Sequence, residues 1–135
     1  MRNSIIAGLI AGFFAGIAAT IIKISNLHGW FSITPYESIP FNMQIIAQVE
    51  MIWHILWGII FGVFYAFFYD YISGTGVKKG IIYGLIIWII VNFRFAAINA
   101  VYGYYQWSIP DALSGFFAIS IVYGLVLGYL YKPPK

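Results

Sequence analysis

The stretch MIWHILWGIIFGVFYAFFYD, residues 51–70, is apolar, aromatic or glycine at every position except a histidine near its start and an aspartate at its end. A helix needs about 20 mostly apolar residues to cross the hydrocarbon of a membrane, and this run supplies them. An isolated strand would leave its backbone groups unpaired in lipid. The stretch therefore predicts a membrane-spanning helix.

The rest of the chain has the same character. Its 135 residues are 62% hydrophobic, 21% aromatic and 8% charged, whereas soluble domains average about 25% charged residues. This composition leaves too little polar surface for a soluble fold, so we predict a single integral membrane domain over residues 1–135. The apolar run behind Arg2 continues to Ile22, beyond the core of about 7–15 residues in a signal peptide, and we expect it to be retained as a first span. The chain has no cysteine, which excludes disulfides and thiolate metal sites.

Four segments are long enough to span, at about 5–25, 47–72, 80–101 and 112–131. They predict an all-α fold, a bundle of four transmembrane helices. The first and third loops contain no Lys or Arg. The two ends of the chain and the middle loop contain five: Arg2, Lys78, Lys79, Lys132 and Lys135. Because Lys and Arg concentrate in cytoplasmic loops, we expect both termini to be cytoplasmic. The expected location is the cytoplasmic membrane of a prokaryote. We expect the chain to interact with the lipid bilayer and not with nucleic acid.

Tyrosine and tryptophan gather at both ends of the predicted spans. The cytoplasmic ends carry Tyr69, Tyr71, Tyr83, Tyr129 and Tyr131, and the outer ends carry Trp30, Tyr104, Tyr105 and Trp107. Amphipathic rings have a physical reason to lie at the membrane interface. We expect anchoring and lipid-facing bulk here rather than stacking on a cofactor, and nothing in the sequence indicates a cofactor.

The two halves of the chain resemble each other. The pair Gly8 and Gly12 recurs as Gly80 and Gly84, and Asn26 with Gly29 recurs as Asn99 with Gly103. Ser-Ile-Pro occurs at 38–40 and again at 108–110, and Gly-x-x-x-Gly-x-x-Tyr occurs at 58–65 and again at 124–131. These matches predict two helical hairpins, about 1–72 and 73–135. Because both enter the membrane from the same side, the repeat is parallel, with a pseudo-two-fold axis along the membrane normal.

Glycines at four-residue spacing form smooth stripes on three of the spans: Gly8, Gly12 and Gly16; Gly58 and Gly62; Gly124 and Gly128. Lipid gives no hydrophobic drive for helix association, so helices in membranes approach through small residues. We expect these stripes to pack the bundle. The alternative is formation of a homodimer through one of them.

Four ionisable residues fall inside the spans or at their edges: Lys23, Glu50, His54 and Arg94. An arginine at a helix centre costs about 2.5–3.5 kcal/mol on insertion scales, so such groups pair or line a wet cavity. Glu50 and His54 are four residues apart and share a helical face. We predict a buried polar cluster in the outer half of the membrane, with Glu50 paired to Arg94. Asn92 and Asn99 form a second polar stripe suited to interhelical hydrogen bonds.

Three interpretations of this cluster stay open. It is a charge-paired staple that fixes the order of the helices, or a polar site open to the outside in which His54 titrates near neutral pH. In the third, Lys23 and Glu50 snorkel to the interface. Metal binding is disfavoured because the chain has two histidines, one of them in a loop, and haem ligation by His28 and His54 is the least favoured. No nucleophile elbow, zinc-protease or phosphate-loop motif occurs.

The pattern His54-x-x-x-Gly58-x-x-Phe61-Gly62-x-x-Tyr65 follows a glycine-rich first span and a proline-bearing outer loop. It resembles the YagU-like family of small bacterial inner-membrane proteins, most closely over the first two spans. The resemblance implies a polytopic membrane protein associated with acid resistance, with the family's histidine at His54 and its glycines at Gly58 and Gly62. This chain departs from the family in being shorter, with a reduced first outer loop.

We therefore expect a non-catalytic structural or accessory membrane component, as a subunit of a larger complex or as a homo-oligomer, and not an enzyme. The alternative is a small transporter or channel, proton-linked or related to acid stress, that uses Glu50, His54, Arg94 and Lys23. A membrane-embedded enzyme comes third, because one Glu and one His without a nucleophile or a set of metal ligands are too few groups for an active site.

Overall fold

The computed structural model of the chain describes residues 2–27, 41–102, 113 and 115–134. The first three helices are α1 (Arg2–Leu27), α2 (Phe41–Phe68), which ends in a short 3₁₀ turn η2 (Tyr69–Tyr71), and α3 (Gly76–Tyr102). The fourth begins with a π-helical segment η3 (Phe116–Tyr123) and continues as α5 (Gly124–Leu130). The described residues contain no strand. An all-α fold of four helices is confirmed.

Two helices begin earlier than the sequence predicts. α2 begins at Phe41 instead of about 47, directly after Pro40, and α3 begins at Gly76 instead of 80. The turn between them is shorter than expected because α3 begins earlier. Gly74 in the turn has φ of 98°, and Gly76, the first residue of α3, has φ of 51°. Only glycine adopts such left-handed backbone without cost. At the other end, α5 stops at Leu130, just before Pro133 and Pro134, which cannot continue a helix.

Within the part of the chain that the structure describes, three helices are long and apolar enough to cross a membrane, over Arg2–Ile22, His54–Tyr71 and Gly76–Arg94. Their outer surfaces carry large apolar side chains, such as Phe93, which is 77% exposed, and Ile52, which is 61% exposed. Exposed apolar surface on this scale belongs in lipid, and the chain is an integral membrane protein. The apolar part of the fourth helix, Phe116–Leu130, is about 22 Å long by the rise of an α-helix, so a fourth complete span stays a prediction.

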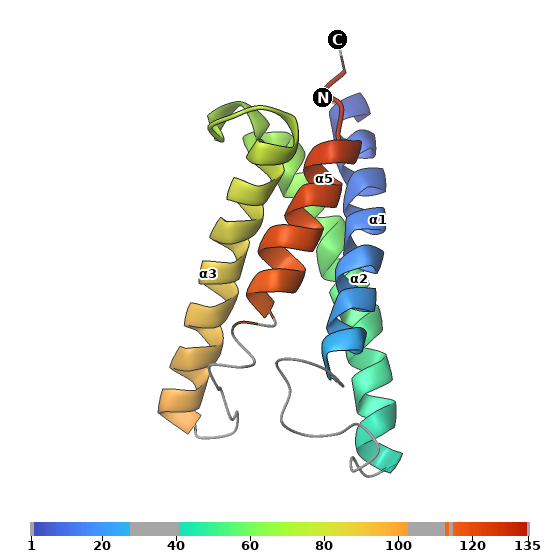
Figure 1. The fold of residues 1–135 in the computed structure, drawn as a ribbon, viewed down its shortest axis with the longest axis vertical. Coiled ribbons are helices and arrows are strands. Elements are labelled where there is room, and N and C mark those ends of the chain that lie inside the picture. Colours follow the sequence, from blue (N-terminus) through green and yellow to red (C-terminus); the bar gives the residue numbers. More distant parts are fainter. Residues whose placement is uncertain (1, 28–40, 103–112, 114, 135) are drawn as a thin grey trace.

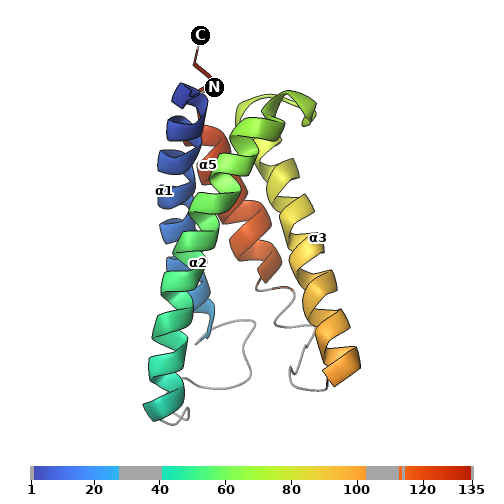
Figure 2. The ribbon, with the colours of Figure 1, turned by 180° about the vertical axis from the view of Figure 1, so that it is seen from behind.

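The helices form two antiparallel pairs (Figure 1). α1 packs along α2, α3 packs along η3 and α5, and the pairs join where α1 also contacts η3 and α5. Both termini and the turn between α2 and α3 lie at the same end of the molecule. Seen from behind, α2 and α3 meet near their turn and diverge toward the other end, with α5 behind them (Figure 2).

Glycines lie where the backbones of each pair approach most closely. A methyl group built on Gly12 would lie 2.5 Å from the carbonyl oxygen of Gly58 in α2. In the other pair, a methyl group on Gly124 would lie 2.6 Å from the carbonyl oxygen of Gly80. Real Cβ atoms do not come this close to a backbone. Both crossings therefore depend on the missing side chain.

The contacts pair the two halves in a register different from the one the sequence suggests. Gly12 faces Gly58 and Gly62, and Gly80 faces Gly124 and Gly128 in the same way. Gly80 thus occupies the place of Gly12 and not of Gly8, one helical turn from the sequence match. The reason is that glycines recur every four residues in both helices, so the sequence alone fits either turn.

Candidate functional site

The residues of the predicted polar cluster lie toward the end of the molecule away from the α2–α3 turn. His54 in α2 and Arg94 in α3 have exposed side chains, and the side chains of Lys23 and Glu50 lie outside the described residues. Along their helices, His54 is about 26 Å from Tyr71 and Arg94 about 27 Å from Gly76. Both are near the far boundary of a hydrocarbon layer about 30 Å thick, where α2 and α3 have diverged (Figure 2). The buried cluster and its Glu50–Arg94 pair stay predictions.

The asparagines predicted to join helices lie in α3. Asn92 donates a hydrogen bond from Nδ2 to the carbonyl oxygen of Trp88, at 2.9 Å, within its own helix. The side chain of Asn99 lies outside the described residues. Interhelical bonding by these two residues stays a prediction.

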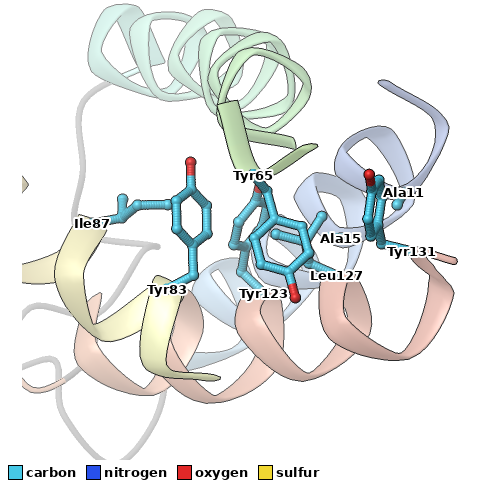
Figure 3. Packing of buried hydrophobic residues seen from close by; sticks show 8 residues of the cluster. All are labelled: Ala11, Ala15, Tyr65, Tyr83, Ile87, Tyr123, Leu127 and Tyr131. Atoms are coloured by element: carbon cyan, nitrogen blue, oxygen red, sulfur yellow. The ribbon is translucent and has the colours of Figure 1, made fainter. Parts of the chain in front are cut away.

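The most closely connected polar groups of the described bundle are tyrosines. Five of them come together where the two helix pairs meet, and we call them the tyrosine layer: Tyr65, Tyr69, Tyr83, Tyr123 and Tyr131. The centroid of the Tyr65 ring is 5.0 Å from that of Tyr83 and 5.2 Å from that of Tyr131. Tyr65 is fully buried, and Figure 3 shows it beside Tyr123 and Leu127 at the centre of the core.

The same local pattern places two of these rings. Tyr65 follows Gly58 and Gly62 at helical positions i+7 and i+3, so it shares their face of α2. Tyr131 follows Gly124 and Gly128 with the same spacing. The helix face whose glycines allow two backbones to approach also directs the next large side chain into the bundle. The motif Gly-x-x-x-Gly-x-x-Tyr was therefore the signal by which these buried rings could have been recognised.

The tyrosines of the expected aromatic belt differ in burial, and interfacial anchoring by the exposed ones stays a prediction. Tyr71 and Tyr129 are 85% and 65% exposed, as interfacial anchors should be. Tyr83 and Tyr131 are only 7% and 3% exposed. Depth along the chain indicated the membrane interface, but both rings turn into the core, Tyr83 from the buried stripe of α3 and Tyr131 from the residue that follows α5.

Two hydroxyls of the layer tie the second pair of helices to α2. Tyr123 donates to the carbonyl oxygen of Gly58 at 2.7 Å, and Tyr83 donates to that of Phe61 at 2.8 Å. Gly58 has no side chain to shield its carbonyl, so a donor from η3 reaches it while α1 lies against the same residue. Three helices thus meet at one glycine.

The Tyr65 hydroxyl differs from these two. It is buried and has no hydrogen-bond partner among the described atoms. An unsatisfied buried polar group is destabilising by about 1–3 kcal/mol. Tyr65 therefore contributes to the layer through the packing of its ring, and its hydroxyl forms no stabilising hydrogen bond with the described atoms.

A lysine closes the layer at the end nearest the turn. Lys79, in the first turn of α3, is 8% exposed and donates from Nζ to the carbonyl oxygen of Tyr69 at 2.6 Å. The same Nζ lies 3.8 Å from the centroid of the Tyr69 ring. A cation at a helix C-terminus offsets the unpaired carbonyls and the dipole there, so Lys79 caps the end of α2.

Lys78 and Lys79 were both expected to be charges that set the orientation of the protein in the membrane. Lys78 is exposed, as expected, but Lys79 turns inward. It lies four residues before Tyr83 and eight before Ile87, on the buried stripe of α3. That four-residue spacing was the available signal for its burial.

The chemistry of this region is that of a joint between helices. Its phenols and one ammonium group donate to backbone carbonyls, and its rings fill the space between helices. Among the described residues, no three His, Cys, Asp or Glu side chains gather as metal ligands. Comparisons with protein-family models, curated proteins and solved structures give no match.

Proposed function

We propose that the chain is a non-catalytic structural or accessory component of the membrane, which acts by holding a fixed helical surface toward a partner protein or further copies of itself. The observation that carries this proposal is that polar side chains in the described interior bind the backbone of neighbouring helices. The hydroxyls of Tyr83 and Tyr123 and the ammonium of Lys79 bind backbone carbonyls of α2 and η2. These groups fix helices to one another, as a scaffold requires.

The test is purification in a mild detergent, followed by identification of whatever protein remains bound. We expect a stoichiometric partner or a defined homo-oligomer. Tyr71→Ala is a matched control because Tyr71 is 85% exposed and outside the tyrosine layer. A bound partner should be lost when the joint is broken by Gly62→Ala and kept in the control. A monomer without bound protein contradicts the proposal.

The proposed orientation has both termini and the α2–α3 turn in the cytoplasm. It is supported by the exposed Arg2, Lys78 and Lys132, which belong to the end where the termini and the turn gather (Figure 1). Lysine and arginine at one end of a membrane protein mark its cytoplasmic side.

The cysteine-free chain allows a direct experiment. Lys78→Cys in intact cells should resist a membrane-impermeant maleimide until the cells are permeabilised, whereas Ser38→Cys should react at once. Reaction of the first variant from outside would reverse the proposed orientation.

The proposed architecture is a parallel repeat of two hairpins with four spans. It is supported by the glycine contacts, in which Gly12 with Gly58 and Gly62 matches Gly80 with Gly124 and Gly128. In this register the first and third helices correspond with an offset of 68 residues, and the second and fourth with an offset of 66. Two nearly equal offsets are what duplication of one hairpin would leave.

A second candidate is a small proton-linked transporter that uses Lys23, Glu50, His54 and Arg94. One observation favours it: His54 and Arg94 are at nearly the same distance from the turn that joins α2 to α3. The acid-resistance association implied by the YagU-like resemblance points the same way. Purified protein in liposomes would then move protons under a pH gradient, and Glu50→Gln or His54→Ala would abolish the flux. Liposomes that carry no flux exclude this candidate and leave the accessory role in place.

A further inference from the structure

An apolar groove runs between α2 and α3, with a volume of about 460 Å³. Its lining runs from Phe61 to Ile72 on one side and from Tyr83 to Ile90 on the other, so it adjoins the turn that joins the two helices. Its lining consists of aromatic and isoleucine side chains, among them Phe64, Ile72, Ile86 and Ile90. The rims are open, since Phe64 is 47% and Ile90 60% exposed.

The lining distinguishes between two occupants, a transmembrane helix and an acyl chain. Helices that associate in lipid present small residues to each other so that their backbones can approach. Among the described residues, the lining of the groove contains no glycine or alanine, and the glycines of α2 already face α1. Bulky, uneven walls keep a rigid helix at a distance, whereas a flexible hydrocarbon chain bends to fill them. The lining therefore favours an acyl chain.

Charge in the turn that follows the groove residue Ile72 indicates the kind of lipid. The turn that follows Ile72 carries Gly74, and the stem of Lys78 lies beside it, its Cγ 3.3 Å from a Cβ built on Gly74. Lys78 is exposed, whereas Lys79 is bound to Tyr69. An exposed lysine at the membrane interface attracts the phosphate of an anionic lipid. Asp70 in η2 is also exposed, and its carboxylate opposes that attraction.

We propose that the groove between α2 and α3 binds one acyl chain of an anionic phospholipid whose phosphate is held by Lys78. The acyl chain supplies affinity through buried apolar surface, and the lysine supplies preference for the charged headgroup. The site goes beyond the accessory role and does not depend on it, because lipid binding is measured on the isolated chain.

Native mass spectrometry of the full chain tests the site. The delipidated protein is incubated with equal phosphatidylglycerol and phosphatidylcholine, and the bound lipid is counted. We expect one retained phosphatidylglycerol. Lys78→Gln should lower the preference for phosphatidylglycerol about fivefold, the loss of one interfacial cation, and Asp70→Asn should raise it. Lys132→Gln is the matched control, because Lys132 is exposed and follows α5 rather than the groove.

A second pair of variants tests the acyl chain. Ile86 lines the groove and Ile89 does not, and both are exposed on α3. Ile86→Trp should fill the groove and lose the bound lipid, whereas Ile89→Trp should keep it. Glycerophosphoglycerol, which has the headgroup but no acyl chain, should not displace the lipid.

Four results overturn the proposal. The first is equal lipid preference in Lys78→Gln and Lys132→Gln. The second is equal lipid retention in the two tryptophan variants. The third is displacement by the headgroup alone, which would assign binding to phosphate recognition without the groove. A photo-crosslinker at Ile86 that captures a protein in place of lipid also overturns it, in favour of a helical partner.

Discussion

The two sides of α2 show two ways in which helices associate in a membrane. Toward α1, Gly58 and Gly62 let the backbones touch. Toward α3, the contact runs through Tyr83, which reaches across to the carbonyl oxygen of Phe61 and leaves an apolar groove beside it. A backbone contact tolerates no added atom, whereas a side-chain contact leaves space and tolerates change. The first side should therefore govern stability, and the second should be free to bind.

The largest effect is expected at the glycine crossing. Gly62→Ala places a Cβ 2.5 Å from the Cα of Gly12 and in contact with the carbonyl oxygen of Gly8. Both neighbours are backbone, so α1 must move away, and we expect a loss of about 3 kcal/mol in the free energy of unfolding. The measurement is denaturation by SDS in mixed micelles. Gly16→Ala is the control, since its nearest atoms would be at 3.4 Å. Equal losses in the two variants would refute the crossing.

The same change in the other pair of helices tests whether the two crossings work alike. A methyl group on Gly80 would contact the carbonyl oxygen of Gly124 and lie 2.6 Å from the amide nitrogen of Gly128. We expect Gly80→Ala to cost about 2 kcal/mol, less than Gly62→Ala, because the described part of the fourth helix is short and can shift as a unit. Gly115→Ala, with its nearest neighbour at 3.7 Å, should be neutral in the same assay. A stable Gly80→Ala protein would count against the common register.

The two lysines at the turn allow a buried cap, Lys79, to be compared with an exposed charge, Lys78. Lys79→Met keeps the apolar stem and removes the hydrogen bond to Tyr69, so we expect a loss of about 1.5–2 kcal/mol, typical of hydrogen bonds from charged donors. Lys78→Met should change stability by less than about 0.5 kcal/mol, as surface substitutions do. Unfolding in mixed micelles measures both. If Lys78→Met were the more destabilising, the cap on α2 would be wrong.

The smallest effect separates two hydroxyls of the tyrosine layer. Tyr123→Phe removes the bond to Gly58, which in a membrane interior is worth about 0.6 kcal/mol on average. Tyr65→Phe removes a hydroxyl that has no partner among the described atoms, so stability should stay unchanged or rise. The difference between the two variants is the informative quantity, because both keep the ring. A larger loss for Tyr65→Phe would show that its hydroxyl is bound.

Much of the fold could be predicted because the signals were local. Apolar runs of sufficient length identified the helices, and the glycine and proline positions marked where they end. The predicted polar cluster was harder, because it required knowing how far each helix runs and in which direction it leans. His54 and Arg94 lie near the ends of their spans that are far from the short turn, where α2 ends and α3 begins, and at those far ends the two helices diverge.

By itself, the sequence determined that this is an all-helical membrane protein, since hydrophobicity and helix length are properties of contiguous residues. Only the tertiary structure decided that Gly80 takes the place of Gly12, that Tyr83 and Tyr131 lie in the core, and that Lys79 turns inward while Lys78 does not. The physical reason is the same in each case. A four-residue repeat puts several turns of a helix on one face, and only the neighbouring helix selects which turn is covered.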